Sequence, residues 1–153
     1  MPIPDSILNK TLTSVTIKGS YVGPYAFYGQ TNLSSVSGRN IDIVDSHSFT
    51  GCTSLTIDSF PFSGIKYIGY GAFSNCTGLS GSLTLPVVGY IDAEAFRGCT
   101  NLTRIELGEN ICVLDAANAI PDSVTTIAVP AKYVDAYKTY PIGSSFANQI
   151  VAR

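Results

Sequence analysis

Four phenylalanines recur along the chain at a nearly constant interval, and this interval constrains the fold more than any other feature. Phe27, Phe49, Phe73 and Phe96 are spaced by 22, 24 and 23 residues. A fixed period of about 20 to 50 residues is typical of solenoids and other repeat architectures. The chain therefore consists of several copies of one short structural unit.

Each phenylalanine is accompanied by four further positions that hold the same kind of residue in every copy. An aliphatic residue stands five positions before it, a small residue one before it, a threonine four after it and a leucine six after it. In that order, these positions hold Val22, Val44, Ile68 and Ile91; Ala26, Ser48, Ala72 and Ala95; Thr31, Thr53, Thr77 and Thr100; and Leu33, Leu55, Leu79 and Leu102. Agreement in so many columns is far beyond chance.

The leucine opens a short segment whose last four residues alternate between apolar and polar, which is the period of a half-buried strand. LTSVTI at 12–17, LTRIEL at 102–107 and VTTIAV at 124–129 show the pattern clearly. Two segments are imperfect. LSSVSG at 33–38 places Gly38 at an inward position. LTIDSF at 55–60 places Asp58 at an inward position, and this second departure predicts a β-bulge.

A unit of this length cannot bury its apolar face alone, whereas stacked units bury a continuous core. We therefore predict an α/β repeat solenoid of about six β-rungs with short helical corners, about 25 to 30 Å long. The predicted core consists of the phenylalanine, leucine and cysteine columns: Phe27, Phe49, Phe73, Phe96, Leu33, Leu55, Leu79, Leu102, Cys52, Cys76 and Cys99.

We expect residues 1–153 to form a single domain with distinct ends. Residues 1–20 supply a half-repeat with a strand, residues 21–130 hold the repeats, and residues 131–153 have the pattern of a helical C-terminal cap. At the N-terminal edge three arrangements stay open: MPIPDSIL folds over the edge, further chain precedes it, or another subunit covers it. The last alternative predicts a homo-oligomer.

The composition excludes several classes of partner. The formal net charge is −2 and charged residues make up 13% of the chain, so there is no basic footprint for nucleic acid. No apolar run reaches about 18 residues, which argues against membrane insertion, and no secretory signal is visible. Serine and threonine supply 31 residues, so the surface is polar mainly through hydroxyl groups.

Three cysteines, Cys52, Cys76 and Cys99, share one column, and Cys112 lies in the degenerate last turn. Zinc sites use closely spaced pairs of ligands, and stacked side chains with parallel Cβ directions do not favour disulfides. Buried free thiols therefore explain the column better than a metal site or a disulfide framework, and no cofactor is expected.

The stretch DSHS at 45–48 suggests a Ser-His-Asp arrangement. Adjacent residues rarely reach the geometry of a triad, which is recognised by spatial roles. We interpret His47 as a residue of a surface corner, in a variable column two positions before the phenylalanine. A hydrolase that uses His47 is the catalytic alternative, and it requires a concave pocket there.

Two surfaces are candidates for binding. The outward positions of the strands form a hydroxyl-rich face, on which Arg104, Glu106 and Lys18 are the side chains able to discriminate between partners. Its outward positions are Ser14, Thr16, Ser35, Ser37, Ile57, Ser59, Ser82, Thr84, Arg104, Glu106, Thr126 and Ala128.

Tyrosines provide the second candidate surface. Tyr25, Tyr28 and Tyr70 fall at variable corner positions, where exposed rings favour protein contacts. A different column, which stands six residues before the phenylalanine, holds Tyr21, Tyr67 and Tyr90 and is expected to pack along one edge.

The unit Ile-Gly-x-x-Ala-Phe-x-x-Cys-x-x-Leu-x-x-Ile-x-Leu-Pro resembles the BspA-type leucine-rich repeat. IGYGAFSNCTGLSGSLTLP at 68–86 and IDAEAFRGCTNLTRIEL at 91–107 match it closely, VDSHSFTGCTSL at 44–55 matches well, and VGPYAFYGQTNL departs by placing Gln30 at the cysteine position. The tail from residue 127 resembles the segment that closes such arrays in gut bacteria and their phages. The resemblance implies a leucine-rich-repeat solenoid and a noncatalytic surface or virion-associated recognition module with diverse partners.

We therefore expect a noncatalytic structural or recognition module that binds protein, or glycan, through a rigid repeat surface. One setting is a phage virion or accessory protein whose partners are virion subunits. The alternative is the C-terminal domain of a bacterial cell-surface adhesin that binds host protein or glycan. The localisation stays open between the virion and the bacterial surface.

Overall fold

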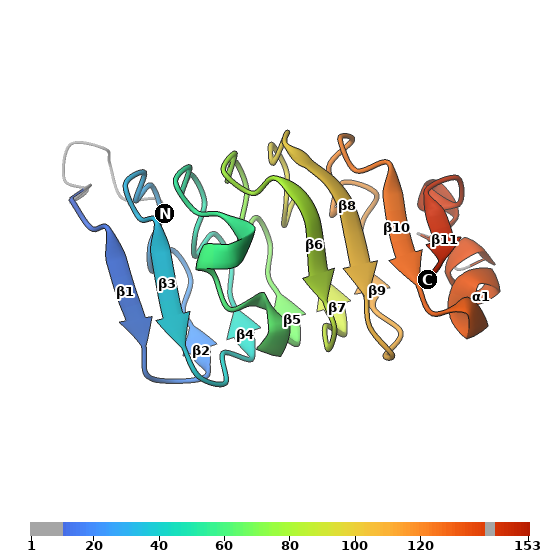
Figure 1. Ribbon diagram of the computed structural model, residues 1–153, viewed down its shortest axis with the longest axis horizontal. Helices are drawn as coiled ribbons and strands as arrows, with labels where there is room; N and C mark the ends of the chain where they lie inside the picture. The colour runs from blue at the N-terminus through green and yellow to red at the C-terminus, as the bar shows by residue number, and fades with distance from the viewer. Residues whose placement is uncertain (1–10, 140–142) are drawn as a thin grey trace.

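Each repeat forms one coil of a solenoid, and the coils stack in chain order along a single axis (Figure 1). The computed structural model describes residues 11–139 and 143–153. Each coil contains a short strand, a run of tight turns and, in all but one coil, a long strand. The short strands of coils one to five are β2 (Tyr21–Val22), β4 (Ile43–Val44), β5 (Tyr67–Ile68), β7 (Tyr90–Ile91) and β9 (Val113–Leu114). The long strands are β3 (Ser35–Gly38), β6 (Gly81–Leu85), β8 (Leu102–Leu107) and β10 (Thr126–Val129). One further strand, β1 (Ser14–Ile17), precedes the first coil.

Neighbouring coils are joined by parallel strands in register. The short strands form a continuous sheet in the order β2-β4-β5-β7-β9. Val22 pairs with Val44, and Ile68 pairs with Ile91, so each position of a repeat lies beside its equivalent in the next. This register confirms the predicted solenoid, although its corners are hydrogen-bonded turns rather than helices.

The long-strand side of the solenoid is interrupted in the second coil. β1 and β3 form a two-stranded sheet, whereas β6, β8 and β10 belong to a separate four-stranded sheet. Between them the chain forms two 3-10 helices, η2 (Ile57–Ser59) and η3 (Phe62–Gly64), in place of a strand. The prediction of a β-bulge at Asp58 is therefore wrong, and Ile57 and Ser59 do not lie on the outward face of a sheet.

Local hydrogen bonding and a proline explain this interruption. The Ser59 Oγ accepts a hydrogen bond from the Thr56 N–H at 2.9 Å, which closes a turn, and Pro61 has no N–H for a strand ladder. The turn places Phe60 and Phe62 in the core, with ring centroids 5.1 and 5.2 Å from that of Phe73. The second coil thus replaces strand pairing with the burial of two additional aromatic rings.

The phenylalanine column forms the centre of the core. Successive ring centroids are separated by 5.2 Å for Phe27–Phe49, 5.6 Å for Phe49–Phe73 and 5.6 Å for Phe73–Phe96. Aromatic pairs at such distances contribute about 0.5–1.5 kcal/mol each beyond the burial of their area. The last three rings are fully buried, and so are Leu33, Leu55, Leu79 and Leu102. The four rings lie in a line along the axis, as the spacing of the repeat predicts.

The C-terminal end is closed by short helices and a strand. η4 (Ala131–Tyr133) continues into α1 (Val134–Thr139), and η5 (Gly143–Phe146) leads into β11 (Ile150–Ala152). β11 pairs in parallel with β10. The cap, for which the sequence predicts helical structure, therefore also adds a further strand to the long-strand sheet.

The cap is tied to the last coil by hydrogen bonds and ion pairs. The buried Tyr137 hydroxyl accepts a bond from the Cys112 N–H at 2.7 Å. Glu109 forms ion pairs with Lys132 at 3.1 Å and with Arg153 at 2.7 Å. At this end of the sheet Ala128, which the sequence predicts on the outward face, is fully buried.

The open question at the N-terminus concerns the segment MPIPDSIL, which lies outside the described residues. The first strand that the structure describes is β1, which pairs with β3. Within the described residues, no helix is both long enough and apolar enough to cross a membrane.

The position of Phe73 at the centre of the aromatic column predicts a large effect on stability. Its ring contacts those of Phe49, Phe60, Phe62 and Phe96. We expect Phe73→Ala to lower the free energy of unfolding in urea by about 3–5 kcal/mol, the usual cost for a buried phenylalanine. Phe27→Ala is the matched control, because this ring is only partly buried. A loss as large for Phe27→Ala would contradict the central role of the buried column.

Candidate functional site

The turns of successive coils are joined by a hydrogen-bond ladder. The phenylalanine N–H groups of the first three coils donate to the residue before the next phenylalanine: Phe27 to Ser48 O at 2.7 Å, Phe49 to Ala72 O at 2.9 Å and Phe73 to Ala95 O at 2.8 Å. The residues two positions before and two positions after each phenylalanine make equivalent bonds in these coils. The turn side is therefore a third hydrogen-bonded face of the solenoid.

Two columns of this face have left-handed backbone conformations. The first column lies two residues before the phenylalanine, with positive φ angles of 58° at Tyr25, 55° at His47, 61° at Gly71 and 58° at Glu94. The second column lies two residues after the phenylalanine and holds Gly29, Gly51, Asn75 and Gly98. A positive φ is uncommon for bulky residues and costs about 1–3 kcal/mol. Gly71 adopts it without strain, so the fold alone does not require a large side chain at this position.

Tyr25, Tyr28, His47 and Tyr70 form a cluster on the turn side, which we call the aromatic ridge. The Tyr25 ring stacks on the His47 imidazole at 5.0 Å, and the Tyr28 ring lies 5.6 Å from that of Tyr25. The Tyr70 ring contacts the His47 imidazole edge-on, with 5.2 Å between the ring centroids. Tyr70 is exposed, and the other three residues are half-buried. The structure thus brings the three corner tyrosines of the sequence together around His47.

His47 is the organising residue of the aromatic ridge. Its Nδ1 lies 3.0 Å from the Thr50 Oγ1, and the Thr50 hydroxyl donates to the Gly71 carbonyl at 2.7 Å. A Cβ on Gly71 would lie 2.6 Å from the imidazole Cε1, so the glycine leaves room for the ring. Loss of solvent around the imidazole lowers the pKa of His47. The ring is therefore held in the neutral form at neutral pH.

The structure does not assemble a hydrolytic triad around His47. The Asp45 carboxylate accepts hydrogen bonds from the Tyr21 hydroxyl at 2.5 Å and from the Ser46 N–H at 2.6 Å. The Ser48 hydroxyl points inward and donates to backbone carbonyls, including that of Gly23 at 2.9 Å. Neither group reaches His47, and the neighbouring Thr50 proton is directed to a carbonyl. The arrangement that the hydrolase alternative requires is not formed.

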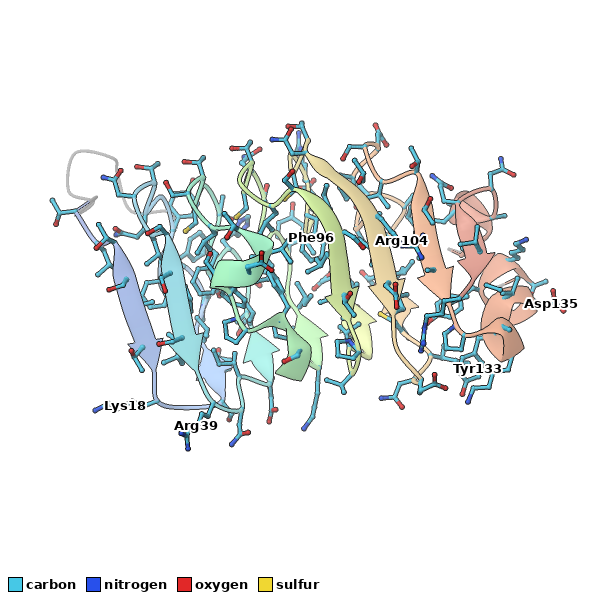
Figure 2. The ribbon with its side chains drawn as sticks, in the orientation of Figure 1. Lys18, Arg39, Phe96, Arg104, Tyr133 and Asp135 are labelled. Carbon is cyan, nitrogen blue, oxygen red and sulfur yellow. The ribbon has the colours of Figure 1, made fainter. Side chains whose placement is uncertain are left out.

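The hydroxyl-rich face is discontinuous, and its charged residues are separated (Figure 2). Arg104 and Glu106 both lie on β8 and form an ion pair with each other at 3.7 Å. Lys18 follows β1 at the other end of the solenoid, beside Arg39 in a shallow depression of about 500 Å³. The face is broken between them by η2 and η3. It therefore does not place Lys18, Arg104 and Glu106 in one site.

The second tyrosine column behaves differently along the stack. Tyr67 and Tyr90 stack at 5.2 Å, as expected for packing along one edge. Tyr21 instead is 53% exposed, because no tyrosine occupies the next position of the column, which holds Ile43. Tyr21 therefore provides an exposed tyrosine outside the aromatic ridge.

Buried thiols support the phenylalanine column. Cys52, Cys76 and Cys99 are free, and each donates from Sγ to the carbonyl of the phenylalanine one coil earlier, at 3.1, 3.0 and 3.0 Å. Burial raises the pKa of Cys52 and of Cys99 to about 12. It also raises the pKa of Cys112 to about 12. These thiols are therefore structural groups with little thiolate at neutral pH.

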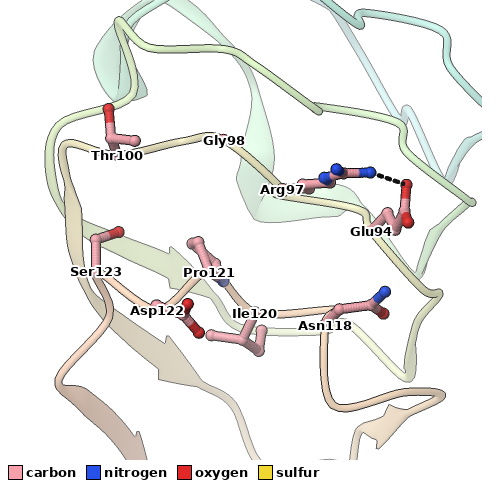
Figure 3. A pocket seen from close by; sticks show the side chains of 9 residues that line it. All are labelled: Glu94, Arg97, Gly98, Thr100, Asn118, Ile120, Pro121, Asp122 and Ser123. Carbon is pink, nitrogen blue, oxygen red and sulfur yellow. Dashed lines mark hydrogen bonds and ion pairs between the residues drawn. The ribbon is translucent and has the colours of Figure 1, made fainter.

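A groove that the sequence analysis missed lies between the turns of the fourth and fifth coils (Figure 3). Glu94, Arg97, Gly98 and Thr100 line one wall, Asn118 and residues 120–123 line the other, and the space between them is about 490 Å³. Glu94 and Arg97 form an ion pair across 3.3 Å at its rim. The nearby Glu94 carboxylate raises the pKa of Tyr70, so the rim of the groove lies close to the aromatic ridge. The signal that could have revealed it is the loss of the repeat pattern after Leu114.

Burial of the cysteines predicts that they do not react in the folded protein. We expect none of the four thiols to react appreciably with an aromatic disulfide reagent under native conditions, because the thiolate forms are suppressed. All four should react once the chain is unfolded in guanidinium chloride, which serves as the control. Rapid labelling of the folded protein, or an increase in intact mass on reduction, would contradict the prediction.

The environment of His47 predicts a loss of stability in mild acid. The folded state lowers the pKa of His47, so below its ordinary value of about 6.5 the unfolded chain binds more protons than the folded chain. We expect the Tm to fall as the pH is lowered from about 7 to 5, and His47→Asn to remove this dependence while tolerating the left-handed backbone. Protonation of Asp45 affects stability only at lower pH, because its pKa in the folded state lies below the usual carboxyl value. The same pH dependence in both proteins would contradict the assignment.

Comparison with known proteins places these features in a family. A model of the BspA type leucine-rich repeat region matches residues 20–132 in 6 copies. The structure is similar to that of a leucine-rich repeat protein from Bacteroides ovatus, with 26% identity and a TM-score of 0.70 over 100% of this chain and 42% of that one. It also shares the fold of a leucine rich cell surface protein from Faecalibacterium prausnitzii, with 23% identity and a TM-score of 0.60 over 92% of this chain and 39% of that one.

No curated protein matches the chain. The chain spans less than half the length of the two solved proteins that it resembles. The family model covers most of the chain and includes all five coils. The chain belongs to the BspA-type leucine-rich repeat family.

Proposed function

We propose that the chain is a noncatalytic recognition module that binds a protein partner through the aromatic ridge. The observation that carries the proposal is the cluster of Tyr25, Tyr28, His47 and Tyr70 on a rigid turn face. Two of these residues have a backbone conformation that large side chains rarely adopt. Strain of this kind concentrates at functional sites, where the surrounding structure holds it in place.

The chemistry of the aromatic ridge suits a protein surface. Tyrosine offers a rigid apolar ring with a hydroxyl group, and such residues are enriched among the side chains that dominate binding energy. The neutral imidazole of His47 extends this ring surface and can still form a hydrogen bond through Nε2, because its Nδ1 already contacts Thr50. Since the ridge is preformed, binding avoids much of the entropy cost of ordering its side chains.

The setting that we propose is the bacterial cell surface. One structural neighbour is named as a cell surface protein, and such a location would present the turn face to host proteins. The chain would then be one recognition part of a longer surface protein, since the neighbours extend well beyond the matched region. A phage virion subunit stays the rival prediction, and the comparisons do not bear on it.

The test compares tyrosines inside and outside the aromatic ridge. We expect the purified chain to bind immobilised mammalian extracellular-matrix glycoproteins in biolayer interferometry. The double variant Tyr25→Ala, Tyr70→Ala should weaken this binding about tenfold or more, as expected when interface anchors are lost. Tyr21→Ala is the control, because it removes an exposed tyrosine ring that lies outside the aromatic ridge.

Enzymatic removal of the matrix glycans separates two kinds of partner. Binding that survives deglycosylation supports recognition of protein, and binding that disappears assigns the ridge to glycan. Equal losses in the ridge variant and in Tyr21→Ala, or the absence of binding by the unmodified chain, would contradict the proposal.

A further inference from the structure

The hydrogen-bond ladder of the turn face stops at the fourth coil. In the third coil, three N–H groups donate to the next turn: Gly71 to Ala93 O at 3.1 Å, Phe73 to Ala95 O at 2.8 Å and Asn75 to Arg97 O at 2.6 Å. Their equivalents in the fourth coil are the N–H groups of Glu94, Phe96 and Gly98. Within the described residues, none of these three donates to the fifth coil.

The sequence of the fifth turn explains why the ladder stops. Eleven positions separate Ile91 from Leu102 in the fourth coil, but only ten separate Leu114 from Val124 in the fifth. Ala119 stands where the phenylalanine of the other coils would be. The shorter turn holds Pro121 and does not supply the missing carbonyls, and it leaves the groove between the two turns (Figure 3).

Two of these N–H groups belong to residues that line this groove. Glu94 and Gly98 line it and are half-buried, whereas Phe96 is fully buried and does not line it. Both lining residues have the left-handed conformation, with φ angles of 58° and 77°. In the preceding coils the equivalent donors are always satisfied by main-chain carbonyls at alternate positions. The groove therefore presents donors in the register of a polypeptide backbone.

The charges of the groove favour a basic occupant. Arg97 and Glu94 are paired with each other, so their charges largely cancel. Asp122 is exposed on the opposite wall and takes part in none of the ion pairs of the described residues. A lysine or arginine side chain in the groove would compensate this carboxylate. Ile120 and Pro121, on the same wall, add an apolar contact.

We propose that this groove binds a peptide segment that carries a basic residue. Backbone carbonyls of the peptide accept hydrogen bonds from the N–H groups of Glu94 and Gly98, and its basic side chain pairs with Asp122. The mode is related to the addition of a strand to an open sheet edge, in which main-chain bonds give affinity and side-chain contacts give specificity. The inference rests on the proposed function in that the partner is a protein, but it uses residues outside the aromatic ridge.

The primary test uses a peptide array whose members share one short sequence and differ in a central lysine, alanine or glutamate. We expect the unmodified chain to prefer lysine-centred over glutamate-centred peptides about tenfold or more. Asp122→Lys should abolish the preference. Asp58→Lys is the matched control, since Asp58 is an exposed carboxylate on η2, and it should leave the preference unchanged.

A second variant removes the groove as a whole, including Asp122, and amide exchange tests the free donors directly. Replacing residues 115–123 with the fourth-coil sequence 92–101 supplies the absent turn and closes the groove. This graft should abolish binding of the lysine-centred peptide without loss of stability in urea. Nuclear magnetic resonance of the unmodified chain should show slower amide exchange at Glu94 and Gly98 when that peptide is added.

Four results would overturn the inference: no peptide bound, no preference for lysine, unchanged exchange at both amides, or full binding by the graft. Its failure is distinguishable from failure of the proposed function. The variant Tyr25→Ala, Tyr70→Ala reports on matrix binding through the aromatic ridge, whereas Asp122→Lys and the graft report on the groove alone.

Discussion

The structure depends on one interaction repeated along the axis, the in-register stacking of equivalent residues from successive coils. The phenylalanine rings are its centre, and the thiols of Cys52, Cys76 and Cys99 each donate to the carbonyl of the phenylalanine one coil earlier. Such a stack gains its stability from contacts between neighbours, so every coil depends on the next. The same stacking keeps the cysteine side chains away from solvent and forces Tyr25 and His47 into one column. The surface features are therefore consequences of the register of the core.

Most of the fold could be predicted from the sequence because repeated columns have a direct physical meaning. A position that is apolar in every copy must lie inside a stack. This rule predicts from the sequence alone that Phe73, Leu79 and Cys76 are buried, as they are in the structure. The family model and the structural similarities agree with this architecture. What could not be predicted is where a copy departs from the pattern. In the second coil, Pro61 and the bond between Thr56 and Ser59 favour 3-10 helices over a strand.

The candidate surfaces were predictable only in part, for a related reason. A column assignment states that Tyr25 and His47 occupy one position, but not that their rings stack or that Tyr70, from a neighbouring column, contacts the same imidazole. The groove was not predicted because no motif marks it. It results from a turn that is shorter than the others and lacks their phenylalanine. Charged residues such as Lys18 and Arg104 are conspicuous in a sequence with few charges, yet the interrupted sheet separates them. Departures from a repeat thus mark the places where a solenoid acquires individual surfaces.

The interruption of the long-strand side also affects how the molecule would respond to mechanical force. At the second coil, lateral hydrogen bonds connect neighbouring coils along the short strands and the turns, but no sheet joins β3 to β6. A load that pulls the two ends apart is therefore shared there by two faces instead of three. Under tension the solenoid would bend open first on this side, at a hinge lined by the rings of Phe60 and Phe62.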